Sequence, residues 1–257
     1  MLKNIKIGIT EYGDAGIDYR WESKLATVDG AILITKNINP LFQKKVLEHL
    51  RETPIIIHCT CTGWGNTAIE PHVPGYKAQL LNLKFLLEAG FPAGNIVLRI
   101  DPVFPTEQGL EKVREVLTFF HSLELPEKEI RYRMSIVDEY PHVRDRYSEA
   151  GIKPIYKGKF GPSGEQIKAV AKVFSEFPYI FATCAEDTLA KVAPDTFISK
   201  GCCSIEDLQI MGLAEKAKGM FENPQKRAGC HCLSCKTELL KPRIECSHKC
   251  MYCFWKY

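Results

Sequence analysis

Three cysteines near the C-terminus, Cys246, Cys250 and Cys253, follow the spacing C-x3-C-x2-C, and Tyr252 stands immediately before the last of them. Thiolates favour soft metal centres, among them iron–sulfur clusters, zinc and Cu(I). Three thiolates are one fewer than the four that ligate a complete [4Fe–4S] cluster. A cluster held by this loop would therefore keep one iron open for a small chelating ligand.

Structural zinc is the alternative interpretation of the same segment. Cys232-x2-Cys235 and Cys250-x2-Cys253 are separated by 14 residues, which is close to the spacing of a zinc ribbon. These residues alone leave both an iron–sulfur site and a structural zinc site open, so the rest of the chain has to distinguish them.

The bulk composition is that of an ordinary globular protein. The chain has 257 residues, of which 45% are hydrophobic and 25% charged, and its formal net charge is +3. This charge does not favour a nucleic-acid partner, and no apolar run resembles a membrane span or a signal peptide. We therefore expect a cytoplasmic protein without membrane contact. Because the cytosol keeps thiols reduced, the 11 cysteines indicate a local site rather than a disulfide framework.

Short apolar runs alternate with helical patterns along most of the chain. We expect strands at 5–10, 30–35, 55–60, 95–100, 131–137 and 179–183, and helices at 18–25, 40–50, 75–89, 106–123, 163–177 and 204–212. Strands joined by helices of this length form parallel sheets. The sequence thus predicts an α/β fold, a partial (β/α)6-type TIM-like barrel of parallel strands over 1–200. A Cys-rich segment over 201–257 is expected to pack on it as one structural unit.

Polar residues recur just beyond the predicted strands. They are Lys36, Thr60, Thr62, Arg99, Asp101, Asp138 and Glu186. In a (β/α) barrel the carboxyl ends of the strands form the face that carries the active site. We therefore expect these side chains to surround the mouth of the barrel.

Motifs along nearly the whole chain resemble a bacterial family of unknown function that is related to the radical S-adenosylmethionine (SAM) enzymes. The motifs are TKN at 35–37, T-x-T-G at 60–63, I-E-P at 69–71, R-x-D-P at 99–102, T-C-A-E at 183–186, G-C-x-C at 229–232 and the terminal C-x3-C-x2-C. TKN and E-P are also similar, more distantly, to spore photoproduct lyase. In the radical SAM superfamily the open iron binds SAM, and an electron from the cluster releases a 5′-deoxyadenosyl radical from it.

The resemblance also implies a permuted topology. Radical SAM barrels carry the cluster loop after their first strand, whereas here the loop lies at the C-terminus. A strand near 243–245 would then insert beside the strand at 5–10, which chain termini that lie close together allow.

The resemblance implies cofactor contacts at the mouth. Cys246, Cys250 and Cys253 would bind the cluster beside Tyr252, and Arg99 would meet the SAM carboxylate, because a guanidinium matches a carboxylate. Further contacts to SAM are expected from Thr60, Thr62, Glu11 and Asp14. Ordinary structural roles stay open for these residues, such as an ion pair between Arg99 and Asp101.

Catalytic roles are expected for Lys36, Cys61 and Asp138. Lys36 and Asp138 follow predicted strands at the mouth, and Cys61 is a candidate hydrogen-atom donor. The alternatives are a solvated strand end for Lys36 and a small core residue for Cys61.

A second metal site is expected from the remaining cysteines. Cys184, Cys203, Cys230 and Cys232 coincide with cysteines of the family pattern, and four thiolates could hold an auxiliary [4Fe–4S] cluster with no open iron. Cys202 and Cys235 are the spare ligands. Structural zinc and buried free thiols stay open as alternatives.

The main hypothesis is a radical SAM enzyme that receives electrons from a protein such as a flavodoxin or a ferredoxin and acts on a small-molecule or macromolecular substrate. A zinc-stabilised barrel, acting as a hydrolase or a binding module, is the first alternative. A nucleic-acid enzyme similar to the lyase is the second, although the basic residues of the tail are scattered.

Overall fold

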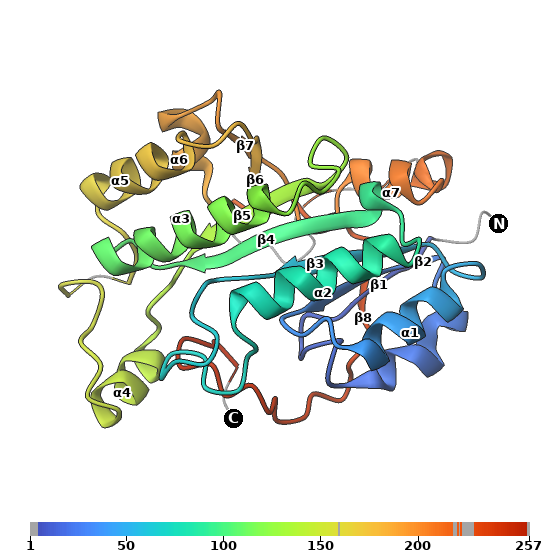
Figure 1. The fold of residues 1–257 in the computed structure, drawn as a ribbon, viewed down its shortest axis with the longest axis horizontal. Coiled ribbons are helices and arrows are strands. Elements are labelled where there is room, and N and C mark those ends of the chain that lie inside the picture. Colours follow the sequence, from blue (N-terminus) through green and yellow to red (C-terminus); the bar gives the residue numbers. More distant parts are fainter. Residues whose placement is uncertain (1–4, 159, 218–219, 221, 223–228, 256–257) are drawn as a thin grey trace.

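The centre of the structure is one sheet of eight parallel strands (Figure 1). The computed structural model describes residues 5–158, 160–217, 220, 222 and 229–255. The strands are β1 (Ile7–Ile9), β2 (Gly30–Thr35), β3 (Ile55–Thr60), β4 (Ile96–Val103), β5 (Arg131–Ile136), β6 (Phe181–Thr183), β7 (Phe197–Ser199) and β8 (Lys236–Glu238). Their order across the sheet is β7-β6-β5-β4-β3-β2-β1-β8. The predicted α/β class with parallel strands is therefore confirmed.

One face of the sheet is covered by four helices that follow the strands. These are α1 (Pro40–His49), α2 (Tyr76–Glu88), α3 (Glu107–Ser122) and α5 (Gly164–Phe174). Their apolar side chains and those of the strands share one continuous core, as alternating βα units require. Side-chain caps fix the starts of three of them: Asn39 caps α1, Thr106 caps α3, and Ser163 forms a capping box with Gln166 in α5.

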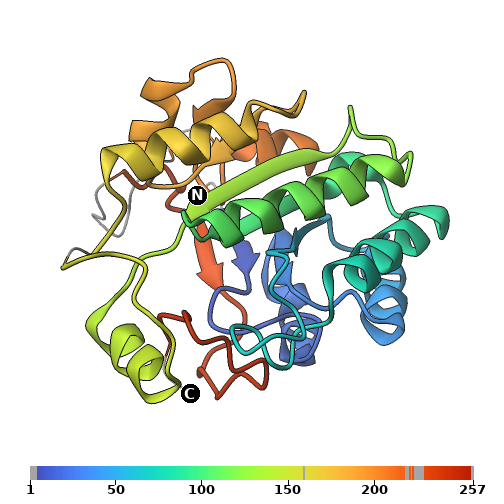
Figure 2. The same cartoon turned by 60° about the vertical axis from the view of Figure 1, so that its left-hand side comes forward.

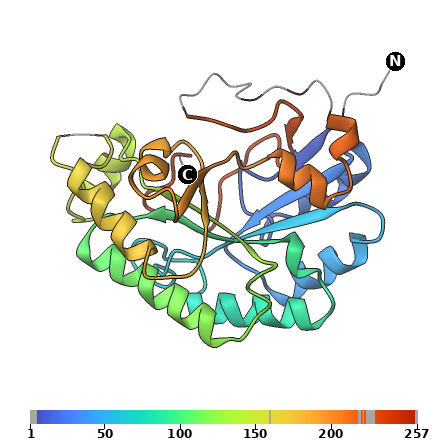
Figure 3. The same cartoon turned by 90° about the horizontal axis from the view of Figure 1, so that it is seen from above.

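The opposite face is covered in part by the segment after residue 200. It contains α7 (Ile205–Ile210) and the short 3-10 helix η3 (Ala214–Ala217), and Figure 3 shows α7 across the sheet from α2 and α3. Leu208, Met211 and Leu213 pack there against the isoleucines of β1 and β2. Asp207, which is fully buried, accepts hydrogen bonds from Arg131 at 2.5 Å and Arg133 at 3.1 Å. This ionic contact fastens the segment to β5.

The strand that pairs with β1 at the edge of the sheet is β8. It lies at Lys236–Glu238, so the predicted position at 243–245 is wrong. Ile7 of β1 is in register with Lys236, and the amide of Leu239 donates to the carbonyl of Ile9 at 2.8 Å. Figure 2 shows the two strands side by side. The strand was missed because its sequence, KTE, lacks the apolar run of the other strands.

Several other elements differ from the sequence-based expectation. The region predicted as a helix at 18–25 is the 3-10 helix η1 (Tyr19–Thr27), and a second 3-10 turn, η2 (Ala93–Asn95), precedes β4. The elements α4 (Pro141–Glu149), α6 (Asp187–Val192) and β7 were not predicted. Within the described residues, β7 and β8 are the two edges of the sheet and do not pair with each other. Among the residues that the structure describes, no helix has the length and hydrophobicity of a membrane span.

His58 of β3 gives the fold an expected pH dependence. It is fully buried, and neither ring nitrogen has a hydrogen-bond partner among the residues that the structure describes. Burial, and then the charges of Arg133, Arg99 and Arg131, hold the pKa of His58 well below its ordinary value. As the pH falls below the ordinary histidine pKa, the unfolded chain takes up a proton that folded His58 refuses. Stability should therefore fall by up to about 1.4 kcal/mol per pH unit.

The measurement is urea unfolding between about pH 7 and about pH 5 for the native protein and His58→Leu. The substitution should remove the part of the slope that His58 contributes, whereas His72→Gln, at an exposed position, should leave the slope unchanged. Equal slopes for the native protein and His58→Leu would show that His58 accepts its proton in the folded state.

Candidate metal and cofactor site

The loop that carries Cys246, Cys250 and Cys253 lies at the edge of the sheet toward which β1 and β8 point (Figure 2). Cys250 is buried and the other two thiols are half-buried. Backbone hydrogen bonds fold the loop into tight turns: the amide of Cys253 donates to the carbonyl of Cys250 at 3.1 Å, and the amide of Met251 donates to Ile69 at 2.9 Å. The three thiols thus belong to one ordered loop at the predicted mouth.

Buried Asp14 fastens the middle of this loop. One of its carboxylate oxygens lies 3.0 Å from Nε2 of His248, which stands between Cys246 and Cys250. The carboxylate also accepts hydrogen bonds from the hydroxyl of Thr35 at 2.6 Å and the amide of Lys36 at 2.6 Å. Burial opposes ionisation, but the charge and hydrogen bond of His248 hold the pKa of Asp14 below its usual value. Asp14, for which a contact to SAM is predicted, is here the hydrogen-bond partner of His248 in the loop.

Buried Glu70 fastens the end of the loop. Its carboxylate accepts hydrogen bonds from Nζ of Lys36 at 2.8 Å, from the hydroxyl of Thr62 at 2.7 Å and from the hydroxyl of Tyr252. The Lys36 ammonium also lies over the Tyr252 ring, 5.5 Å from its centroid. Burial alone would lower the pKa of Lys36, but the charge of Glu70 raises this pKa above its ordinary value. Lys36 is therefore a permanent cation next to the loop.

The thiols of this loop are neutral without a metal. Burial raises the pKa of Cys246 to about 11 and the pKa of Cys250 to about 12, while the charge of Lys36 lowers both. Burial also raises the pKa of Cys253. A metal that binds here would replace thiol protons and would meet soft sulfur ligands beside one fixed positive charge.

Arg99 and Glu11 lie on the same side of the sheet and carry ion pairs. Arg99 pairs with Asp101, whose carboxylate also accepts a hydrogen bond from Ser135 at 2.6 Å. Glu11 accepts from Nζ of Lys236 at 2.8 Å. Burial disfavours the charged guanidinium, but nearby groups raise the pKa of Arg99. These groups are Asp101, Cys202, Glu11 and Cys184. The ion-pair alternative for Arg99 is thus present in the structure.

The other predicted catalytic and cofactor residues lie in different environments. Thr60 is buried and its hydroxyl has no hydrogen-bond partner among the described residues. Cys61 is part of the apolar core under the helices, and burial raises the pKa of its thiol well above the ordinary value. Asp138 is half-buried in the segment between β5 and α4. Of these three, Thr60 offers an unused polar atom.

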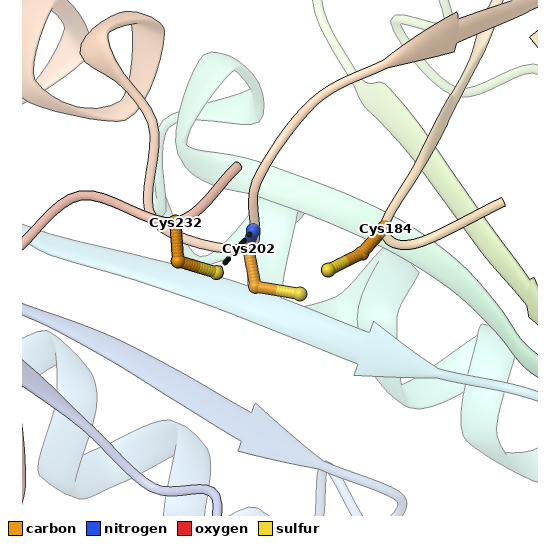
Figure 4. A group of neighbouring side chains, drawn as sticks. All are labelled: Cys184, Cys202 and Cys232. Carbon is orange, nitrogen blue, oxygen red and sulfur yellow. Dashed lines mark hydrogen bonds between the residues drawn. The ribbon is translucent and has the colours of Figure 1, made fainter. Parts of the chain in front are cut away.

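A second cysteine group lies at the ends of β6 and β7. The sulfur atoms of Cys184, Cys202 and Cys232 all lie within 4.8 Å of one another, and Figure 4 shows the Cys184 and Cys202 side chains pointing toward each other. Cys230 packs in the same group. Cys203, predicted as a ligand, lies instead in the apolar cluster that contains Cys235 and the isoleucines of β1. Cys202, predicted only as a spare ligand, lies in the group in place of Cys203.

Hydrogen bonds within this group stabilise one thiolate. The thiols of Cys184 and Cys202, and the charge of Lys236, lower the pKa of Cys232 to about 3. The same hydrogen bonds raise the pKa of Cys184. The backbone amide of Cys202 also donates to the sulfur of Cys232 at 3.2 Å. The sulfur of Cys232 is therefore the acceptor on which the hydrogen bonds of this group converge.

The sequence model of the family described as "Domain of unknown function (DUF1848)" matches residues 15–255. The chain belongs to the DUF1848 family. No curated protein gives a significant match to this DUF1848 chain. The resemblance to a family of unknown function is thus confirmed, and the structure shows what its motifs do locally: Lys36 of TKN and Glu70 of I-E-P form the ion pair that holds the DUF1848 cysteine loop. Sequence reasoning missed His248, for which its place inside the cysteine motif was the available signal.

Proposed function

We propose that this protein is a radical SAM enzyme in which Cys246, Cys250 and Cys253 hold a [4Fe–4S] cluster. The observation that carries the proposal is the loop itself: three cysteines on one loop, which two buried carboxylates fasten at the carboxyl edge of a parallel sheet. Active sites of such α/β folds lie at this edge. A cubane has four irons, so three thiols leave one iron without a cysteine ligand. A chelating cosubstrate needs such an open iron.

The donor set fits a cluster better than a single ion. Within the part of the chain that the structure describes, the three sulfurs of this loop are not all within 4.8 Å of one another, in contrast to the group around Cys202. Ligands of one ion must share a small sphere, whereas each cysteine of a cubane binds a different iron. When bound, the cluster and SAM would supply a carbon-centred radical for hydrogen abstraction.

The residues of the chain would position and shield these groups. Tyr252, held by Glu70, packs against Phe104 beside the loop cysteines, and Lys36 would offset part of the negative charge of the thiolates. Arg99 is the proposed contact of the SAM carboxylate, and Thr60 of its ribose, because the hydroxyl of Thr60 is otherwise unpartnered within the described residues. Roles for Thr62, Glu11 and Asp14 toward SAM, and for Lys36, Cys61 and Asp138 in the reaction, are part of the same proposal.

The topology is consistent with a permuted partial barrel. The neighbour of β1 on its outer side is β8, which comes from the end of the chain and leads into the cysteine loop (Figure 2). If the two termini were joined and the chain were opened before β8, β8 would become the first strand and the cysteine loop would follow it directly. We further propose a cytoplasmic enzyme that is reduced by a flavodoxin- or ferredoxin-like protein.

The test is electron paramagnetic resonance of anaerobically reconstituted, dithionite-reduced protein with and without SAM. An iron that lacks a cysteine ligand should bind SAM, so the spectrum of the reduced cluster should change when SAM is added. A spectrum that SAM does not alter would mean that the cluster has no open iron, and the absence of any iron–sulfur signal would refute the cluster.

A further inference from the structure

We propose that Cys184, Cys202, Cys230 and Cys232 bind a single soft divalent ion, zinc in the first instance, in a closed four-thiolate site that is separate from the C-terminal loop. The site does not depend on the proposed radical chemistry. It would be structural, because four protein ligands leave no position open for a substrate.

The spacing of the sulfurs favours a single ion. Zn–S bonds are about 2.3 Å long, so two thiolates on one tetrahedral zinc stand about 3.8 Å apart. The sulfurs of Cys184, Cys202 and Cys232 already lie within 4.8 Å of one another (Figure 4). A cubane would have to spread them over separate irons. A change of about 1 Å or less in the distance between each pair would bring these three sulfurs to the spacing of ligands on one zinc ion.

The backbone is built so that three chain segments converge on this point. A Cβ on Gly201 would lie 2.3 Å from the carbonyl oxygen of His231, so only glycine lets the turn before Cys202 touch the segment that carries Cys232. Gly229 has φ +67 and packs on Ala185, whose amide donates to the carbonyl of Gly229 at 3.1 Å. These two close approaches bring residue 184, the turn at 202 and the C-x-C segment together.

Cys230 is the proposed fourth ligand because of its packing and its place in the sequence. It is buried in the same cluster and stands two residues before Cys232 on the same segment, although its sulfur is not among the three that lie within 4.8 Å of one another, so its side chain would have to turn toward the ion. Cys203 and Cys235 are excluded because they lie in the apolar cluster beneath β1, where each is the hydrogen-bond partner of the other. Adjacent cysteines at 202 and 203 thus have different surroundings.

The surroundings of the group suit a site with net negative charge. Four thiolates around a divalent ion carry two excess negative charges, which need nearby cations when half-buried. Lys236 and Arg99 are within electrostatic reach of the cysteines of this group, and each is also paired with a carboxylate, that of Glu11 and that of Asp101 respectively. The amide of Cys202 donates to the Cys232 sulfur at 3.2 Å, and such a hydrogen bond would orient this ligand. Ligand thiols give up their protons when the ion binds.

The experiment uses the full chain with Cys246→Ala, Cys250→Ala and Cys253→Ala combined, so that metal on the C-terminal loop cannot contribute. Metal analysis after exhaustive dialysis should find about one zinc per chain. Adding Cys202→Ala should reduce bound zinc at least tenfold, whereas the matched neighbour Cys203→Ala should leave it unchanged. Cobalt in place of zinc should give the intense thiolate charge-transfer absorption and the visible bands of a tetrahedral site.

Each other outcome overturns the proposal. About four irons with equal sulfide in the parent variant would show a second cluster instead of a single ion. If Cys203→Ala lost its zinc and Cys202→Ala kept it, the proposed set of ligands would be wrong. If Cys202→Ala does not fold, Cys184→Ser, at the half-exposed position, replaces it. A folded parent variant that binds no zinc and gives no cobalt–thiolate absorption would exclude the site.

Discussion

Cys250→Ala is expected to remove about four irons per chain from anaerobically reconstituted protein and to abolish the cleavage of SAM. The thiol at 250 is the buried member of the C-terminal three and stands next to Lys36 and Glu70. Loss of one of three ligands leaves a cubane with two attachments to the protein, which does not hold it. Iron and sulfide analysis measures the first effect, and chromatography of the nucleoside products measures the second.

Cys59→Ala is the matched control for this prediction. Cys59 is equally buried, but its thiol lies in the core under α2, where Gln79 donates to it at 3.7 Å. This variant should keep its iron and its reactivity while losing some stability through the small cavity that it creates. Full iron content in Cys250→Ala, or equal iron loss in both variants, would contradict the assignment of the C-terminal loop.

Glu70→Gln is expected to destabilise the protein by about 3 kcal/mol, because it leaves the largely buried ammonium of Lys36 without its counter-charge. Glu70 is 1% exposed and is the common partner of Lys36, Thr62 and Tyr252, so its loss also frees the end of the cysteine loop. Urea unfolding gives the free energy. Limited proteolysis should show faster cleavage of the chain after residue 245.

Two further variants decide whether the charge is the cause. Lys36→Met combined with Glu70→Gln should recover much of the lost stability, since an unpaired charge is no longer buried. Glu48→Gln breaks the exposed i,i+4 pair with Lys44 and should cost no more than about 0.5 kcal/mol. A Glu70→Gln variant as stable as Glu48→Gln would show that the buried ion pair does not hold the loop.

The sequence predicts the central part of the fold because its strands are apolar on both faces. The runs in β2, β3 and β4 are rich in β-branched and other apolar residues and are easy to recognise. Strand β8, with the sequence KTE, and β7, with exposed Ile198 and Ser199, lie at the edges of the sheet and lack that pattern. Edge strands are defined by which neighbour they pair with, and this information is spread over distant parts of the chain.

The candidate site could be predicted only as a set of residue types. Cysteine spacing identifies the C-terminal loop, but it does not reveal that Asp14 and Glu70 hold the loop, because these carboxylates are 182 to 234 residues away in sequence. The choice between Cys202 and Cys203 is similar. Successive side chains of an extended segment point to opposite sides. The thiol of Cys202 therefore lies in the cysteine group, and the thiol of Cys203 lies in the apolar cluster.

The most direct test of the central claim is the detection of 5′-deoxyadenosine when reconstituted, reduced protein is incubated with SAM. We expect the nucleoside to form only when the cluster, the reductant and SAM are all present, and to be absent with the variant that lacks Cys246, Cys250 and Cys253. Protein that contains about four irons on this loop but forms no 5′-deoxyadenosine, or protein that binds zinc there instead of iron, would contradict the claim.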